Sequence, residues 1–201
     1  DSLPSWSVLV KLSAAALNFR DLLVSDGAYN PRFRLPLVPV SDGAGEVVAI
    51  GSDVRQTTIG QRVMIAYMEG WQDGPLTDEI RRTTLGGPVD GVLRQYRLVA
   101  EGDIVQIPED LSFADAACLP CAGVTAWAAL HDHCKVKAGD WVLVQGTGGV
   151  SLFALQFAKA MGARVAVISS SDEKLKVAKS LGADHLHNYK TAQDWAPAIL
   201  G

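Results

Sequence analysis

The feature that most constrains this 201-residue sequence is an alternation of apolar strands and amphipathic helices in its second half. "WVLVQ" (Trp141–Gln145) is a short apolar run of the buried parallel-strand type, and the helical segment "GVSLFALQFAKAMGA" follows it. The strand "RVAVISS", the helix "SDEKLKVAKSLGAD" and the short strand "HLHNY" come next. This β-α-β-α-β order predicts right-handed crossovers and a parallel sheet.

A glycine-rich turn joins the first of these strands to its helix. In "VLVQGTGGVS", one glycine allows a tight turn, and another lets the backbone approach a pyrophosphate that faces the helix N-terminal N–H groups. The third position of the G-x-G-x-x-G pattern is Ser151, which is small enough for close packing of helix and strand. Set in a βαβ unit, the motif favours dinucleotide binding over a merely tight turn.

The end of the second strand bears on the choice of cofactor. NAD-preferring sites carry an acidic residue there, whereas this chain has Ser169–Ser171, whose hydroxyls do not repel a 2′-phosphate. Lys174 lies one helical turn further on and can pair with that phosphate, and Tyr189 can add a phenolic donor. The serines also suit an ordinary N-cap for the helix at Asp172, and both interpretations can hold together. We therefore expect NADP(H) in preference to NAD(H).

The first half of the chain is rich in short strands and turns. Strands are predicted at Ser7–Leu17, Gly43–Gly51, Gln61–Tyr67 and, as a pair, within Gln95–Pro108. A long polar loop fills 68–94, and an Ala-rich helical segment begins near Ser112 and is broken at Pro120. We expect two domains, a β-rich one over 1–111 and an α/β one over 112–201.

Charge and composition exclude some classes of function. The formal net charge is -4, from 18 basic and 22 acidic residues, which argues against a nucleic-acid or anionic-membrane binder. No apolar run approaches a membrane span, and no signal peptide is recognisable. The three cysteines cannot all pair within the chain, so we expect reduced thiols and a cytoplasmic location.

The stretch "HDHC" raises the possibility of metal chemistry. His131 and Cys134, with Cys121 upstream, carry side chains that zinc accepts as ligands. They lie at the end of a predicted helix, where Trp127, Leu130, His131 and Cys134 share one face that we expect to pack inward. No third and fourth ligand lies at motif spacing, so a buried cysteine and helix-end histidines are the favoured interpretation over a zinc module or metal-dependent hydrolase.

Five segments in order resemble the medium-chain dehydrogenase/reductase superfamily, in its zinc-independent, quinone-oxidoreductase-like and alcohol dehydrogenase-like branch. They are "LNFRD" (Leu17–Asp21), "VSDGAGEVVAIG" (Val40–Gly51), "LPCAGVTAWAAL" (Leu119–Leu130), "GTGGVSLFALQFAKAMGA" (Gly146–Ala163) and "SSDEKLKVAKSLGADH" (Ser170–His185). The resemblance implies an α/β plus β fold: a GroES-like, β-rich catalytic domain followed by the first half of a Rossmann parallel sheet. Relative to the family the chain is truncated at both ends, and the full-length protein is expected to be a homodimer.

The resemblance also implies a site. The positions matching cofactor-binding residues are Asn18, Thr125, Gly146, Thr147, Gly148, Gly149, Val150, Ser170, Lys174 and Tyr189. In the zinc-dependent relatives, Cys, His or Glu, and Cys hold the catalytic zinc. Asn18, Ser41 and Cys121 stand in those places here, so only one ligand remains and no zinc is expected.

The expected activity is NADPH-dependent hydride transfer to a small carbonyl, quinone or enone substrate without catalytic zinc. Arg20 matches the proton-relay position of the zinc enzymes and is the candidate catalytic residue, as an electrophile for a developing oxyanion. A salt bridge from Arg20 to Asp21 or Asp42 is the equal alternative. Tyr67 and Trp71 are candidates to line the substrate cleft. The rival function is an inactive or structural nucleotide-binding relative that turns over nothing.

Overall fold

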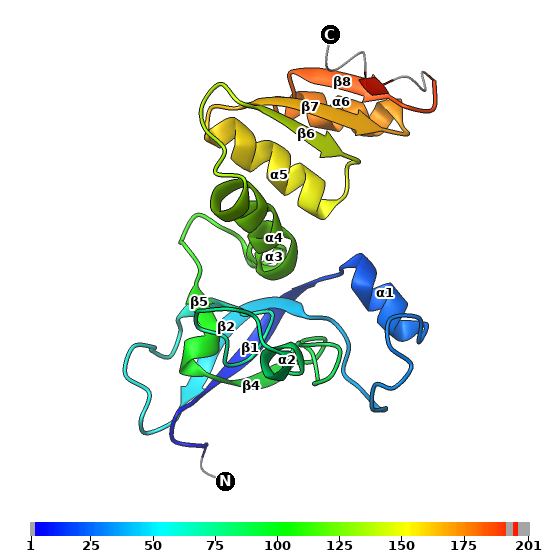
Figure 1. Cartoon of the computed structure of the whole chain (residues 1–201). Coiled ribbons are helices and arrows are strands. Elements are labelled where there is room, and N and C mark those ends of the chain that lie inside the picture. Colours follow the sequence, from blue (N-terminus) through cyan, green and yellow to red (C-terminus); the bar gives the residue numbers. More distant parts are fainter. Residues whose placement is uncertain (1–2, 192–194, 197–201) are drawn as a thin grey trace. The chain divides into compact units, whose positions relative to one another are not determined.

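A computed structural model describes residues 3–191 and 195–196 and divides the chain into two compact units, Asp1–Cys121 and Ala122–Gly201 (Figure 1). The division falls after Cys121 rather than at the expected 111. The reason is α3 (Phe113–Ala117), which packs on the strands of the first unit. Its Ala116 and Ala117 are buried in one cluster with Ala44 and Ile107.

The first unit is built on a five-stranded antiparallel sheet in the order β4-β1-β2-β3-β5. Its strands are β1 (Ser7–Ala16), β2 (Asp42–Ile50), β3 (Arg62–Ile65), β4 (Tyr96–Ala100) and β5 (Ile104–Gln106). Each lies within or next to a segment where alternation predicted a strand. Gly45 of β2 is required by the close approach of β1, because a Cβ there would lie 2.1 Å from the carbonyl oxygen of Lys11.

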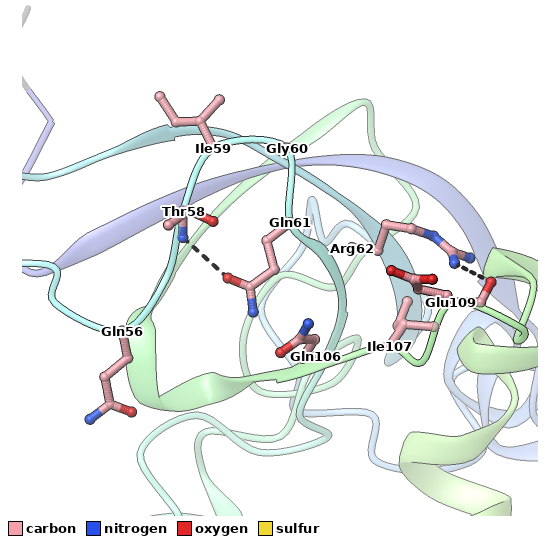
Figure 2. Close-up of a pocket in the computed structure, with 9 residues that line it drawn as sticks. All are labelled: Gln56, Thr58, Ile59, Gly60, Gln61, Arg62, Gln106, Ile107 and Glu109. Carbon is pink, nitrogen blue, oxygen red and sulfur yellow. Dashed lines mark hydrogen bonds between the residues drawn. The ribbon is translucent and has the colours of Figure 1, made fainter.

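A polar hollow of about 550 Å³ lies in the first unit, beside β3 and β5 (Figure 2). The Gln61 side chain accepts a hydrogen bond from the Thr58 N–H group, and Arg62 donates to the Glu109 carbonyl. Amide and hydroxyl side chains dominate the lining, and none of the predicted site residues belongs to it. The lining residues are Gln56, Thr58, Ile59, Gly60, Gln61, Arg62, Gln106, Ile107 and Glu109.

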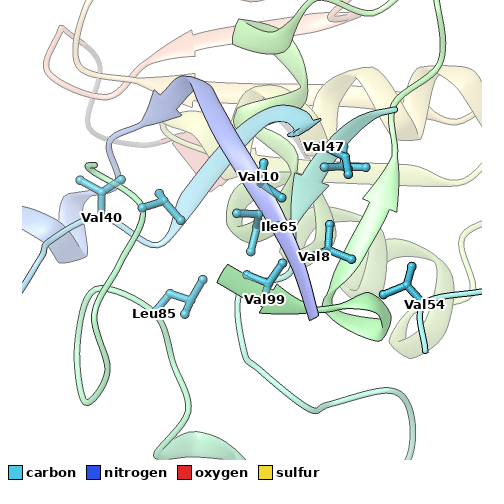
Figure 3. Close-up of a cluster of buried hydrophobic side chains, with 10 residues drawn as sticks. Val8, Val10, Val40, Val47, Val54, Ile65, Leu85 and Val99 are labelled. Carbon is cyan, nitrogen blue, oxygen red and sulfur yellow. The ribbon is translucent and has the colours of Figure 1, made fainter. Parts of the chain in front are cut away.

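One face of this sheet carries the main hydrophobic core of the unit (Figure 3). Val8 and Val10 of β1 are fully buried, as the period of two in a strand requires for one face. Leu85, from the long loop between β3 and β4, is buried in the same cluster. That loop also contains the short helix α2 (Asp78–Arg81), and its Met68 forms an isolated bridge with Thr84.

A helix not predicted from the pattern, α1 (Phe19–Ser25), follows β1. It is short, and its start is set by Asn18 and Asp21: the Asp21 Oδ2 accepts a hydrogen bond of 2.7 Å from the Asn18 backbone N–H group. Asp21 is buried, so this helix start is part of the interior of the unit.

The second unit contains a parallel sheet in the order β6-β7-β8, as the β-α-β-α-β pattern predicted. The strands are β6 (Trp141–Gln145), β7 (Arg164–Ser169) and β8 (His185–Asn188), connected by α5 (Gly149–Ala160) and α6 (Asp172–Ser180). Leu155 and Ala158 of α5 pack with Val165 and Val167 of β7 in one buried cluster. The predicted fold class, a GroES-like antiparallel sheet followed by a parallel sheet with helical crossovers, is confirmed.

The helical connection between the sheets is irregular. α3 ends at Ala117, and a π-helical turn, η2 (Leu119–Gly123), contains Pro120. A short α4 (Val124–Trp127) and a second π-helical segment, η3 (Ala128–His133), follow. The interruption expected at Pro120 therefore falls at Cys118, just before it. Within the described ranges, no helix has the length and apolar character needed to cross a membrane.

Candidate functional site

The glycine turn of the second unit leaves backbone N–H groups without a side-chain cap at the start of α5. Gly146 has a φ of 85°, and its N–H group donates to the Ile168 carbonyl at 2.7 Å, which ties the turn to β7. The Ser151 hydroxyl donates to the Gln145 carbonyl at 3.0 Å across the same turn. Gly148 is the N-cap of α5 and provides no side-chain cap, so the N–H groups of the first turn are left for a ligand.

This turn fits a dinucleotide pyrophosphate. A Cβ built on Gly148 would meet nothing within 4 Å, so its backbone is open to close approach. The helix behind it is twelve residues long, and its dipole favours negative charge at this end. Thr147 and Val150 lie in the turn and at the helix start, and the Val150 side chain is exposed.

A small pocket of about 170 Å³ lies beside the turn, lined by Thr147, Leu152, Lys174 and Val177. It brings Lys174 of α6 to the same place as the glycine turn. The Thr147 hydroxyl also lies 3.4 Å from the Ser169 hydroxyl at the end of β7. Lys174 therefore lies where a cation can meet phosphate charge.

The other predicted phosphate contacts lie at the carboxyl ends of β7 and β8. Ser169 is paired in register with Asn188, so Ser170 and Tyr189 follow neighbouring strand ends. The Tyr189 N–H group donates to the Ser169 carbonyl at 3.1 Å. Ser171 is the N-cap of α6 and accepts from the Lys174 N–H group, so the capping interpretation holds for this serine.

Asp42 organises the polar cluster of the first unit. The Ser41 hydroxyl donates to its Oδ1 at 2.6 Å, and the Cys121 N–H group donates to its Oδ2 at 3.0 Å. The side chain is almost fully buried. Burial raises the pKa of Asp42 above its usual value, while these two hydrogen bonds act in the opposite direction.

Arg20 lies in the same cluster, between two aromatic rings. Its Cζ is 5.1 Å from the centroid of the Tyr29 ring and 5.5 Å from that of the Tyr67 ring. Nη1 donates to the Leu85 carbonyl at 3.0 Å. Nε is buried without a hydrogen-bond partner.

No ion pair joins Arg20 to either nearby aspartate in the part of the chain that the structure describes, so the salt-bridge alternative is wrong here. The Asp21 Oδ1 is also buried without a partner. The Asn18 side chain, in contrast, acts as a hydrogen-bond partner of the Asp42 carboxylate and lowers its pKa. Because buried polar groups are normally satisfied, Arg20 Nε and Asp21 Oδ1 are open to a water molecule or a polar ligand.

Two ionisable groups near Arg20 stay protonated at neutral pH. Burial raises the pKa of Tyr67 to about 12, and the positive charge of Arg20 opposes that rise. Burial, with the charge of Asp42, raises the pKa of the Cys121 thiol to about 11. Of the two predicted cleft residues, Tyr67 belongs to this cluster, whereas the Trp71 Nε1 donates to the Gly74 carbonyl on the exposed loop.

The donor set around Cys121 does not fit a catalytic zinc ion. Zinc prefers thiolate, imidazole and carboxylate ligands, but the Asn18 amide and the Ser41 hydroxyl stand in the two positions that would accompany Cys121. Asp42 already accepts two hydrogen bonds. The residues described contain no group of three or more His, Cys, Asp and Glu side chains arranged to hold a metal ion.

The HDHC segment makes local contacts. The His131 ring stacks on the Trp127 ring at a centroid distance of 4.9 Å, and its Nδ1 lies 2.7 Å from the Asp132 carboxylate. The expectation that Trp127, Leu130, His131 and Cys134 form an inward face is wrong. Only Leu130 is buried, whereas Trp127 and His131, whose rings stack, and Cys134 are exposed.

The remaining predicted residues divide between the units. Asn18 and Arg20 lie at the start of α1 in the first unit, whereas Thr125 is exposed on α4 of the second. Sequence reasoning missed the contacts of Arg20 with Tyr29 and the Leu85 carbonyl. No local sequence pattern predicts these contacts, because Leu85 lies 65 positions further along the chain than Arg20.

Known protein families match both units. The alcohol dehydrogenase GroES-like domain matches residues 5–109, and the zinc-binding dehydrogenase family matches residues 149–201. A zinc-type alcohol dehydrogenase-like protein of Schizosaccharomyces pombe is 49% identical over 196 residues, which cover 96% of this chain and 56% of that protein. The chain thus spans little more than half the length of this relative.

Solved structures agree with this match. A putative alcohol dehydrogenase from Sinorhizobium meliloti 1021 superposes with a TM-score of 0.90 at 43% identity, over 99% of this chain and 59% of that one. A quinone oxidoreductase from Pseudomonas syringae gives a TM-score of 0.77 at 31% identity, over 100% of this chain and 55% of that one.

Proposed function

This chain belongs to the medium-chain dehydrogenase/reductase superfamily, and on that premise we propose that it is the main part of a nicotinamide-dependent oxidoreductase. The proposed reaction is hydride transfer to a small carbonyl, quinone or enone compound, without zinc. The observation that carries it is the uncapped glycine turn of α5 beside the Lys174 pocket. The relatives support the same reaction class, because their names describe alcohol dehydrogenases and a quinone oxidoreductase.

We propose NADP(H) as the preferred cofactor. The support is chemical: hydroxyls in place of a carboxylate at the end of β7, and an ammonium group from Lys174 beside the turn.

The chemistry assigned to this chain's own residues centres on Arg20. When bound, the reduced nicotinamide supplies a hydride to the carbonyl or enone carbon, which leaves negative charge on the substrate oxygen. The Arg20 guanidinium, with no carboxylate partner, stabilises that charge. Tyr67, protonated at neutral pH, lines the same cluster, and a proton from it or from water completes the reduction.

A second candidate function is nucleotide binding without turnover. It needs only the uncapped glycine turn and the Lys174 pocket, and it assigns no chemistry to Arg20.

The first test is a calorimetric titration of the 201-residue chain with NADPH and then with NADH. Tight NADPH and weak NADH binding supports the oxidoreductase proposal, and NADPH oxidation with a panel of aldehydes, quinones and enones then separates the two candidates. Binding with no turnover of any substrate supports the second. Absence of binding to either nucleotide overturns both for this chain.

A further inference from the structure

Gly87 lies directly against the Arg20 guanidinium. A Cβ built on Gly87 would stand 2.1 Å from Nη2 and 3.3 Å from Cζ of Arg20, and 3.4 Å from Cε2 of Phe33. A separation of 2.1 Å is far below van der Waals contact. Any side chain at position 87 therefore displaces the guanidinium from its present place.

The backbone gives no other reason for this glycine. Gly87 is not among the glycines with positive φ, so an L-residue is compatible with its conformation. The neighbouring Gly86 is different: its φ is 62°, and a Cβ there would lie 2.7 Å from Val40 backbone atoms. Gly86 is required by the turn, whereas glycine at position 87 leaves room for the Arg20 guanidinium.

The guanidinium is held on its other sides by groups that do not neutralise it. Tyr29 and Tyr67 offer ring faces, and the Leu85 carbonyl accepts from Nη1. A charged side chain in such a place normally has a carboxylate partner. Arg20 has none among the described residues, so the arrangement is preorganised for an anionic oxygen that arrives with a ligand.

We propose that Gly87 is a positioning residue, whose bare backbone seats Arg20 between Tyr29 and Tyr67 as a receptor for an anionic oxygen. The catalytic part of this inference rests on the proposed function, in which that oxygen is the one that gains charge when hydride reaches the substrate. The binding part does not, because a small carboxylate is a stable mimic of the same group. Gly87→Ala should therefore move Arg20 without unfolding the chain.

The matched control is Gly102→Ala. Gly102 also lacks a positive φ, and its Cβ would stand 2.9 Å from the Nε2 atom of the Gln72 side chain, which is flexible and exposed. Both substitutions thus push aside the end of one side chain, but only that at position 87 touches Arg20. Both variants should keep the thermal midpoint of the unmodified chain within about 3 °C. Gly102 is exposed, and at the buried Gly87 the atoms nearest to the new methyl group belong to side chains and not to the backbone.

The decisive readout is the nitrogen–proton resonance of Arg20 Nε, identified as the signal that Arg20→Lys lacks. It should shift in Gly87→Ala and stay in place in Gly102→Ala. Sodium butyrate should shift it further in a saturable way in the unmodified chain. Gly87→Ala should need roughly tenfold or more butyrate, because a hydrogen bond to a charged group is misplaced.

Turnover provides the second readout. In Gly87→Ala kcat should fall by roughly 10²-fold with the KM for NADPH unchanged. In an Arg20→Lys background the same substitution should change kcat by less than about twofold, because the two residues act as one unit. If neither the unmodified chain nor any variant reduces a carbonyl compound, the proposed function fails. The Arg20 Nε resonance still tests whether Gly87 positions Arg20. An unshifted Arg20 signal with unchanged butyrate binding in Gly87→Ala overturns the inference.

Discussion

Arg97 of β4 donates from Nη2 to the Glu69 carboxylate at the start of the long loop. Its Nη1 donates to the Gly91 carbonyl near the loop's other end, at 3.2 Å. One almost fully buried arginine thus holds both ends of the loop that delivers Leu85 and Gly87 to Arg20. This charged residue of the sheet adds to the contacts within the loop, which include the Met68–Thr84 bridge.

Replacing Arg97 by methionine should lower the free energy of unfolding by about 1–3 kcal/mol, because a carboxylate and a carbonyl lose their buried donor. The control is Arg94→Met, which removes a more exposed pair with Asp90 at 3.6 Å and should cost less than about 1 kcal/mol. Urea denaturation measures both. Equal losses in the two variants would show that Arg97 does not anchor the loop.

Asp184 should make stability depend on pH in the acid range. Hydrogen bonds from Lys159 and from the Val165 N–H group lower the pKa of Asp184 below its usual 3.8. The folded state therefore favours the charged form, so this contribution is present above pH 3.8 and is lost as pH falls through the lowered pKa. Asp184→Asn should be less stable than the unmodified chain at pH 7, and the gap should narrow below pH 3.8. A gap that widens with acid would contradict the assignment.

Lys174→Gln should weaken NADPH binding by roughly tenfold and leave NADH binding nearly unchanged, since only the former carries the 2′-phosphate. Lys176→Gln is the control, because this exposed lysine of α6 does not line the pocket. Calorimetry measures all four affinities. Equal weakening of both nucleotides by Lys174→Gln would place the lysine at a group that they share, such as the pyrophosphate.

Cys121 should be a slow nucleophile near neutral pH. With its pKa raised to about 11, its alkylation by iodoacetamide should keep accelerating up to that pH. The measurement is peptide mass spectrometry after timed labelling in a Cys118→Ser, Cys134→Ser background. Asp42→Asn should speed the reaction at pH 8, because it removes a negative charge that raises the thiol pKa. A plateau already at pH 8 in the unmodified sequence would refute the neutral thiol.

Chelation should leave the protein unaffected. Dialysis against 1,10-phenanthroline is expected to change neither the thermal midpoint nor NADPH affinity, because the donors around Cys121 do not suit zinc. Elemental analysis of the purified chain should find well under one zinc per molecule. Stoichiometric zinc whose removal lowers the midpoint would overturn the proposal of zinc-free chemistry.

The strands and long helices of the second unit were predicted well, because each is recognisable from residues that are neighbours in the sequence. Trp141–Val144 is an uninterrupted apolar run, and the helices after it begin and end at recognisable caps and glycines. The strands of the first unit were predicted for the same reason. Helix α1 was missed, since seven residues with one capping pair give too weak a period.

The arrangement around Arg20 was only partly predictable. Its position in the "LNFRD" motif marked it, but the choice between electrophile and ion pair depends on contacts with Leu85 and Gly87, more than sixty positions away. Glycine at 87 looks in sequence like any other loop glycine. Only the three-dimensional structure shows that the Arg20 guanidinium occupies the space that a side chain at position 87 would need.

Asp42 has a consequence for the construction of chimeric proteins from this family. Its Oδ2 accepts the Cys121 N–H group, so the sheet of the first unit includes a hydrogen bond from the very end of that unit. A graft that exchanges residues up to 111 would cut between the two partners and risk leaving a buried carboxylate oxygen without its donor. A transplantable module should instead run through Cys121, with both residues taken from the same parent.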